Sequence, residues 1–265
     1  QAVEHFGIRY PVALDNEHIT WDSFHNNYWP AKYIFDKNGN LYACEGEGRR
    51  LALYKKNEET ITITDNFQGK KYNEPNDLAI HPDGNNIWFS DPNYGGRKPF
   101  LDHESVYLAH KNSDNSWYVS RATFDTTRPN GVLLSKDTNF LYVAESPYGD
   151  TVRRQFRSYP VNKDKTFGDH TVLHDFGEGR GIDGMCLDTE GNILATAGHH
   201  EAGPGPMIYH FTPSGRVMTT YNAPADKPTN CSFGGENLDI LFITFAGGEV
   251  YQVKNTGLKG HLLFP

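Results

Sequence analysis

A hairpin pattern that recurs about every 50 residues is the feature that most limits how this chain can fold. Each copy has an apolar run, a short segment rich in Asp, Asn or Gly, and a second apolar run. Such a pattern predicts a β-hairpin, because the favoured tight turns need a positive φ that Gly and Asn adopt easily. The predicted hairpins span residues 33–44, 78–91, 132–145, 185–197 and 232–245.

The spacing of these hairpins predicts a β-propeller. Their second strands align on apolar residues separated by 46, 54, 52 and 48 positions, namely Leu41, Ile87, Leu141, Ile193 and Leu241. A repeat of this length made of strands and turns is typical of propellers, in which each blade is a four-stranded antiparallel sheet. A third strand is visible in each copy, at residues 51–54, 106–109, 156–159, 207–210 and 250–253. No segment has a sustained helical periodicity.

Five copies are clear, and the number of blades depends on the two ends of the chain. A sixth blade can be assembled from residues 1–30 and the tail after Lys254, and it would close the ring and hide its sheet edges. That blade would contain unusually few residues. We therefore predict an all-β, six-bladed propeller with a truncated first blade, and a single domain over residues 1–265.

Composition narrows the choice of partners and compartment. The formal net charge of −8 disfavours nucleic acid or an anionic membrane as a partner. No apolar run approaches the roughly 20 residues that span a bilayer, and residues 1–5 do not have the pattern of a signal peptide. Cys44, Cys186 and Cys231 have no metal-site spacing and are expected to be buried thiols, which favours the cytoplasm. A periplasmic or secreted protein stays possible if Gln1 is a mature terminus.

Polar residues recur just before the first strand of several hairpins. Asn76, Asn130 and Asp183 each lie two residues before the first apolar residue, and Asn230 holds the corresponding place in the next copy. Because the innermost strand of a blade lines the central channel, we expect these side chains to meet at one mouth of it. Their oxygens suit Ca²⁺, whereas zinc would need Cys or His. A lone Asn or Asp is ordinarily a turn former, but the repeated register favours a metal site.

Six short motifs occur in a fixed order along the chain. They are FDKNGNLYACEG (35–46, followed by RR at 49–50), NEPND (73–77), FSDPNYG (89–95), PNG (129–131), DGM (183–185) and PTNCSFGG (228–235). With this set the chain resembles the gluconolactonase, senescence-marker-protein and luciferin-regenerating-enzyme family over about residues 31–253. The resemblance implies a six-bladed propeller, a divalent metal at its axis and hydrolysis of sugar lactones or related esters. The metal is usually calcium, with manganese, magnesium or zinc as alternatives.

The resemblance also assigns roles to individual residues. It implies metal ligation by Asn130 and Asp183, and contact with metal or substrate by Asn76. The family has an early metal-binding Glu in a Glu-Gly-Pro-x-Trp segment, where this chain has Glu17-His18-Ile19-Thr20-Trp21. Glu17 is therefore the expected further ligand, although the Gly and Pro are missing, and Glu4 is a weaker candidate.

Two further segments are candidates for contact with substrate. Asn73 belongs to the NEPND motif, and His199 follows the fourth hairpin together with His200. A His near the channel can act as an acid or base, because its pKa lies near neutrality; the alternative is an exposed loop pair. The segment 91–96 is expected beside the mouth, where it either shapes the pocket or forms an ordinary turn.

Together these observations predict a calcium-dependent lactonase that acts on a small-molecule lactone. A metal would polarise the carbonyl and stabilise the oxyanion as water attacks, and Asp183 is the predicted general base. No Gly-x-Ser-x-Gly motif provides a serine nucleophile. Two alternatives stay open: an organophosphate hydrolase similar to diisopropyl fluorophosphatase, and a non-catalytic propeller that binds calcium for structure and another protein through one face.

Overall fold

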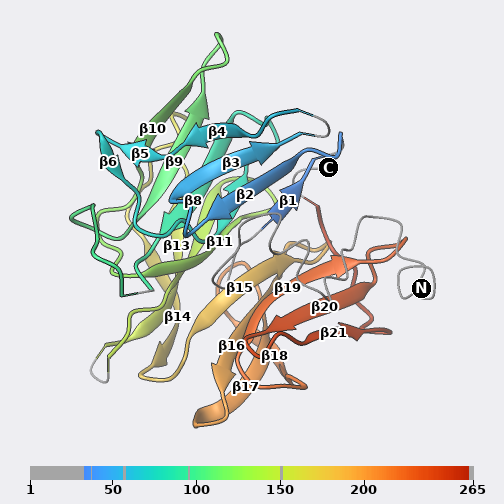
Figure 1. Ribbon diagram of the computed structural model, residues 1–265. Helices are drawn as coiled ribbons and strands as arrows, with labels where there is room; N and C mark the ends of the chain where they lie inside the picture. The colour runs from blue at the N-terminus through green and yellow to red at the C-terminus, as the bar shows by residue number, and fades with distance from the viewer. Residues whose placement is uncertain (1–32, 37, 56–57, 95, 150–151, 263–265) are drawn as a thin grey trace.

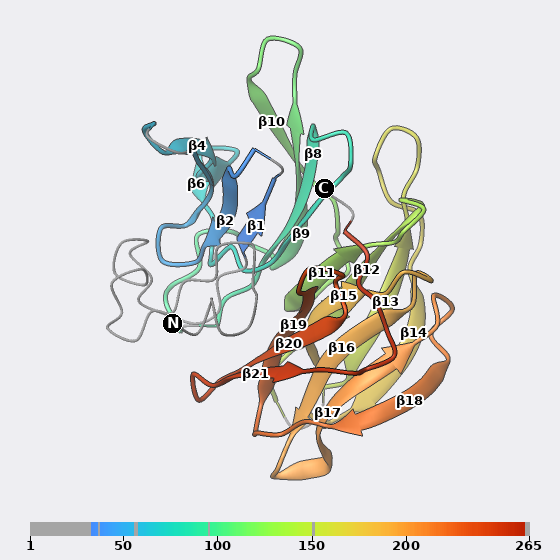
Figure 2. The same ribbon diagram turned by 90° about the vertical axis from the view of Figure 1, so that its right-hand side faces the viewer.

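The computed structural model describes residues 33–36, 38–55, 58–94, 96–149 and 152–262. Over these residues the regular structure consists of β-strands. The strands form antiparallel sheets, and Figures 1 and 2 show these sheets following one another as blades around an arc. Within the described segments, no helix has the length and apolar character needed to cross a membrane.

Each blade is built from strands that are consecutive in the chain. The first sheet contains β1 (Tyr33–Phe35), β2 (Leu41–Glu45), β3 (Arg50–Tyr54) and β4 (Ile61–Thr64). The second contains β7 (Leu78–Ile80), β8 (Asn86–Asp91), β9 (Ser105–Lys111) and β10 (Trp117–Arg121). The third contains β11 (Pro129–Leu134), β12 (Phe140–Glu145), β13 (Arg154–Pro160) and β14 (Thr171–Gly177). The fourth contains β15 (Ile182–Leu187), β16 (Ile193–His199), β17 (Ala202–Phe211) and β18 (Val217–Asn222). The fifth contains β19 (Pro228–Gly234), β20 (Ile240–Phe245) and β21 (Val250–Val253), and β5 (Asn66–Phe67) pairs with β6 (Lys70–Lys71) as a small separate ribbon.

The prediction of an all-β propeller is confirmed, as are the five hairpins and the third strand of each copy. The structure differs at the start of three inner strands. The strands β11, β15 and β19 begin before the apolar run, and each has a register shift near its first residues. Such a β-bulge bends a strand and re-aims its side chains. The polar residues that were expected to precede these strands therefore lie within them.

The predicted sixth blade falls largely outside the described residues. Residues 1–30, with Glu4 and Glu17, belong to the part that is not described. The tail forms no strand between residues 254 and 262. There Gly260 makes an isolated bridge to Asp188, and the backbone on either side of it bonds to Thr189 and Leu187. The single domain over residues 1–265 stays a prediction.

The core lies between the faces of neighbouring blades. The five residues used to align the repeats are all at most 5% exposed, because alternate side chains of a strand point to opposite faces and both faces are covered. Consecutive inner strands β7, β11, β15 and β19 contact one another. Of the three thiols, Cys44 and Cys231 are buried and Cys186 is half-buried. The Sγ atoms of Cys186 and Cys231 lie 3.6 Å apart where β15 meets β19.

Candidate functional site

One end of the inner strands, called the mouth here, brings three of the predicted site residues together. Asn76 lies before β7, Asn130 in β11 and Asp183 in β15. The Asn76 Nδ2 donates a hydrogen bond to Asn130 Oδ1 at 2.7 Å, although the two residues are 54 positions apart. The Asn130 side chain also lies close to the carboxylate of Asp183, whose pKa it lowers, and Gly131, next to Asn130, packs against the Asp183 backbone. A connected row of amide and carboxylate groups thus crosses three neighbouring blades.

The backbone at the mouth is so closely packed that two positions require glycine. A Cβ atom on Gly131 would lie 2.2 Å from the backbone oxygen of Asp183. A Cβ atom on Gly184 would lie 2.2 Å from the side chain of Asn230. Both glycines immediately follow predicted site residues, in the bulged part of β11 and β15. Their small size lets the blades approach closely enough for the site residues to meet.

A buried carboxylate fixes β7 against β11. Asp77 is 4% exposed, and its two oxygens accept hydrogen bonds from the backbone N–H of Leu78 at 2.7 Å and of Val132 at 3.0 Å. The second bond joins residues of different blades. Since Asn76 and Asn130 are close neighbours of these groups in the chain, Asp77 sets the relative position of their amides.

Arg180 is a cation at the mouth that the sequence analysis did not single out. Its Nη2 donates to Asp183 Oδ2 at 2.6 Å. Its Nη1 donates to the backbone oxygens of Pro228 at 2.9 Å and Gly198 at 3.2 Å. Arg180 therefore links Asp183 to the ends of β16 and β19. Two of these three partners are backbone carbonyls 18 and 48 positions away in the chain, so no local motif signals this role.

The surroundings of Asp183 raise the pKa of its carboxyl toward neutral pH. Burial raises the pKa of its carboxyl to about 6, and the negative charge of Asp77 acts in the same direction. The Arg180 guanidinium and the nearby Asn130 side chain oppose this rise in the pKa. A carboxylate with a pKa near the operating pH is suited to accept a proton.

The remaining predicted residues are placed differently. Asn73 is 1% exposed, and its Oδ1 accepts from the backbone N–H of Phe100 at 3.2 Å and Leu101 at 3.5 Å, so this oxygen supports a loop. His199 ends β16, next to the Gly198 carbonyl bound by Arg180. Its Nδ1 is buried, with no hydrogen-bond partner within the described residues. The substrate contacts expected of both side chains stay predictions, and Glu17 lies outside the described residues.

Two tyrosines lie on the loops that follow β8 and β12, and Ser146 of the second loop donates a hydrogen bond to the backbone oxygen of Ile182, next to Asp183, at 2.9 Å. Tyr94 and Tyr148 have ring centroids 5.5 Å apart. Burial raises the pKa of the Tyr94 hydroxyl, and the negative charge of Asp183 raises this pKa further. Tyr94 belongs to the 91–96 segment that the sequence placed beside the mouth, whereas Tyr148 had no such signal.

The donor chemistry of the mouth fits part of the shell of a hard cation. Asn130 and Asp183 offer oxygen atoms, and Asn76 adds a further amide. Calcium takes roughly six to eight oxygens, so these residues can supply only part of its ligands. No three His, Cys, Asp or Glu side chains gather as a metal-binding group in the described part of the chain. The oxygen-only set disfavours zinc.

Comparison with known proteins identifies the family. Residues 11–247 match the SMP-30/Gluconolactonase/LRE-like region, and the chain belongs to this family. It is 31% identical over 209 residues to a gluconolactonase of Zymomonas mobilis, covering 72% of this chain and 53% of that protein. It is 25% identical over 220 residues to a 6-deoxy-6-sulfogluconolactonase of Pseudomonas putida, covering 80% of this chain and 61% of the relative.

A solved structure supports the same assignment. The gluconolactonase of Xanthomonas campestris superposes with a TM-score of 0.68 at 27% identity, over 83% of this chain and 70% of that one. The family resemblance inferred from the six motifs is thereby confirmed. The chain spans about half the length of the first curated relatives it matches, 53% and 50%.

Proposed function

We propose that this chain hydrolyses a sugar lactone or a related lactone at the mouth, with a bound divalent cation, calcium in the first place. The observation that carries the proposal is the connected row of Asn76, Asn130 and Asp183. It occurs in a member of a family that includes proteins named gluconolactonase. No observation favours the phosphotriester or the non-catalytic alternative, and both become outcomes of the test.

The proposed roles follow from the contacts. Asn130 and Asp183 would hold the cation, with Glu17 as the further carboxylate expected from the family pattern. When bound, a cation of this kind supplies a Lewis acid that polarises a carbonyl and favours negative charge on its oxygen. Asp183 accepts a proton from the attacking water, and Arg180 orients its carboxylate through Oδ2. Asn76 orients Asn130 through their hydrogen bond and lies in reach of substrate bound there.

The overall reaction balances without a redox partner. The water oxygen forms a bond to the carbonyl carbon, and the bond from that carbon to the ring oxygen breaks. The proton accepted by Asp183 is returned to the ring oxygen as it leaves. The product is an open-chain hydroxy acid.

The test compares Asp183→Asn and Asn130→Ala with the wild type on a lactone panel, followed with a pH indicator over a range of calcium concentrations. At saturating calcium, Asp183→Asn should lower kcat by about 10²–10⁴-fold, because it removes the base. Asn130→Ala should mainly weaken metal affinity, so that excess calcium restores part of the activity. Asp137→Asn, an exposed turn residue, is the control and should leave activity unchanged.

Thermal melting provides a second readout. A cation bound to the native state should raise Tm relative to a chelator, by mass action, and the rise should be smaller for Asp183→Asn. Full activity of Asp183→Asn would remove the base assignment, and an equal calcium response would remove Asp183 as a ligand. If the calcium-loaded wild type turns over phosphotriesters and no lactone, the organophosphate alternative is the better one. Turnover of neither class would favour the non-catalytic propeller.

A further inference from the structure

An aromatic pair beside Asp183 has no role in the proposed reaction. Tyr94 follows β8 and Tyr148 follows β12, so the two rings come from neighbouring blades. Their centroids are 5.5 Å apart and their planes are inclined by 46°. Tyr148 is 63% exposed, whereas the Tyr94 hydroxyl is buried. The pair therefore presents one accessible ring and one enclosed polar group.

A charged side chain supports both rings. The Arg128 guanidinium carbon lies 4.6 Å from the ring centroid of Tyr148 and 5.7 Å from that of Tyr94. Such cation–π contacts favour a fixed ring position. Glu104 holds this guanidinium through two hydrogen bonds, at 3.0 and 3.2 Å.

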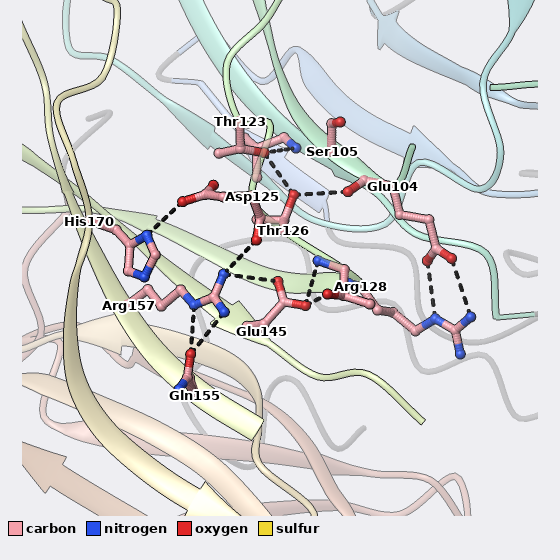
Figure 3. Close-up of polar contacts among 12 residues, drawn as sticks. Glu104, Ser105, Thr123, Asp125, Thr126, Arg128, Glu145, Gln155, Arg157 and His170 are labelled. Carbon is pink, nitrogen blue, oxygen red and sulfur yellow. Dashed lines mark hydrogen bonds and ion pairs between the residues drawn. The ribbon is translucent and has the colours of Figure 1, made fainter. Parts of the chain in front are cut away.

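Figure 3 shows how the arginine itself is anchored. The Glu145 carboxylate accepts hydrogen bonds from the backbone N–H of Thr127 and Arg128, both at 2.7 Å. Arg157 lies on the other side of Glu145, with its Nη1 3.8 Å from Oε2. The support of the tyrosines is thus part of the buried polar network between the second and third blades.

The loop that carries Tyr94 is also held by carboxylates. Glu74 accepts hydrogen bonds from the backbone N–H of Tyr94 at 2.7 Å and from Arg97 Nε at 2.9 Å. Glu104, which pairs with Arg128, also accepts from the Asn93 N–H at 2.8 Å. Groups fixed in this way lose little further freedom when a ligand binds, which favours affinity.

The Tyr94 hydroxyl has no hydrogen-bond partner within the described residues, although it is buried. A buried polar group without a partner opposes folding. A ligand group placed next to it would supply the missing bond. The loop of Tyr148 lies against the start of β15, because Ser146 Oγ donates a hydrogen bond to the backbone oxygen of Ile182, next to Asp183, at 2.9 Å. The pair therefore belongs to the neighbourhood of the proposed base.

We propose that Tyr94 and Tyr148 form a subsite that binds the ring of a polyhydroxylated lactone. The exposed face of Tyr148 packs against the C–H face of the ring, and the Tyr94 hydroxyl donates a hydrogen bond to a substrate hydroxyl. A sugar ring offers both an apolar face and polar edges, and tyrosine matches the two. An aliphatic lactone lacks the hydroxyls, so the subsite favours sugar lactones. This inference rests on the proposed lactonase function.

The test measures binding separately from turnover. Gluconolactam, a ring amide that replaces the hydrolysable ester, is titrated into calcium-loaded protein by calorimetry. Tyr148→Ala should weaken its Kd about 10-fold or more, as expected for truncation of a packed aromatic anchor. Tyr94→Phe should weaken it about 2–12-fold, the range for one neutral hydrogen bond. In steady-state assays KM for gluconolactone should rise more than kcat falls, while KM for δ-valerolactone should change less in Tyr94→Phe.

Each variant has a matched control elsewhere in the chain. Tyr118 on β10 is as exposed as Tyr148, at 63%, so Tyr118→Ala removes a similar surface away from the mouth. Tyr107 on β9 also has a buried hydroxyl without a hydrogen-bond partner in the described structure, so Tyr107→Phe is the control for Tyr94→Phe. Neither control should change lactam binding. Tyr94→Phe should melt at the same temperature as the wild type or higher, because the lost hydroxyl has no partner in the native protein.

The outcomes separate this inference from the proposed function. If the wild type hydrolyses gluconolactone but Tyr148→Ala and Tyr94→Phe bind the lactam normally, the subsite is wrong and the lactonase stands. If no lactone is hydrolysed but the lactam binds and Tyr148→Ala weakens that binding, the subsite stands and the reaction is wrong. If the lactam does not bind to the wild type, the subsite is overturned. A lower melting temperature for Tyr94→Phe would show that its hydroxyl serves the fold instead.

Discussion

The hairpin turns at one end of the inner strands and the site at the other end differ in how far the hydrogen bonds that form them reach along the chain. Long-range bonds also occur at the turn end, for example from Lys136 Nζ to the Thr189 oxygen, 53 positions away, but they do not close the turns. At the end opposite the mouth, each inner strand turns into the next strand through bonds between near neighbours. Asp188, for example, accepts from the backbone and the side chain of Asn192, four residues away, and Asp36 binds Asn40 in the same way. At the mouth the bonds join residues 54 and 55 positions apart.

The interactions that form a single blade are therefore different from those that position the site. A turn that is closed by its own residues can be repeated in every blade without reference to its neighbours. A mouth residue is positioned by other blades, through Asp77, Arg180 and the two crowded glycines. Substitutions at the mouth should therefore affect several blades at once, and substitutions at the turns should stay local.

The largest effect is expected for Gly131→Ala. Its Cβ would lie 2.2 Å from the Asp183 carbonyl oxygen, and a backbone atom cannot move aside without shifting β15 against β11. We expect the free energy of unfolding to fall by about 3 kcal/mol, as measured by urea denaturation. In Gly168→Ala the nearest atoms would be 3.5 Å away, and the change should stay within about 0.5 kcal/mol. Equal effects of the two substitutions would show that the mouth is not the more constrained end.

A smaller effect is expected when the mouth loses its buried carboxylate. Asp77→Ala leaves the backbone N–H groups of Leu78 and Val132 without their acceptor. Each unsatisfied buried group costs at least about 1 kcal/mol, so the loss from the two groups should be about 2 kcal/mol. Asp77→Asn keeps one acceptor oxygen and should fall between the wild type and Asp77→Ala.

The matched substitution at the turn end is Asp137→Ala. Asp137 accepts hydrogen bonds from Ser135 and Asn139, but it is exposed, so water can replace it. We expect its removal to cost about 0.5 kcal/mol. A cost as large as that of Asp77→Ala, in the same denaturation experiment, would contradict the distinction between the two ends.

The same distinction explains which features could be predicted from the sequence. The turns were predictable because their bonds are local and leave a short motif such as Asp-Lys-Asn-Gly-Asn at residues 36–40. The positions of Asn76, Asn130 and Asp183 followed from the repeat once the blades were aligned. The repeat did not predict the bulges or the roles of Arg180 and Tyr148, because each depends on partners from other parts of the chain.

The fourth strands were also missed, for a different reason. Strands such as β14 and β18 lie at the edge of their sheets and contain only half-buried and exposed positions. A strand with so little burial needs no continuous apolar run, so its hydrophobic pattern is weak. The four-stranded blade was predicted from the length of the repeat rather than from these strands themselves.

A small gain in stability is expected from a substitution within a single turn. In the turns of the first four blades, the residue that donates its N–H back to the start of the turn has a positive φ. Three of these residues are Gly39, Gly84 and Gly191, with φ of 77°, 71° and 83°, and the fourth is Thr138, with φ of 63°. A β-branched residue is strained in this conformation, by about 1–2 kcal/mol. Part of the gain from glycine is lost to the greater freedom of the unfolded chain.

Thr138→Gly should therefore raise the free energy of unfolding by about 0.5–1 kcal/mol. Thr138→Ala is the control, because alanine keeps the Cβ that causes most of the strain and should give a smaller gain. Lactone turnover should be the same in both variants, since the turn lies at the opposite end of β11 from Asn130. Unfolding curves and kcat measured together decide the matter: a change in kcat would mean that the turn and the mouth are coupled through β11.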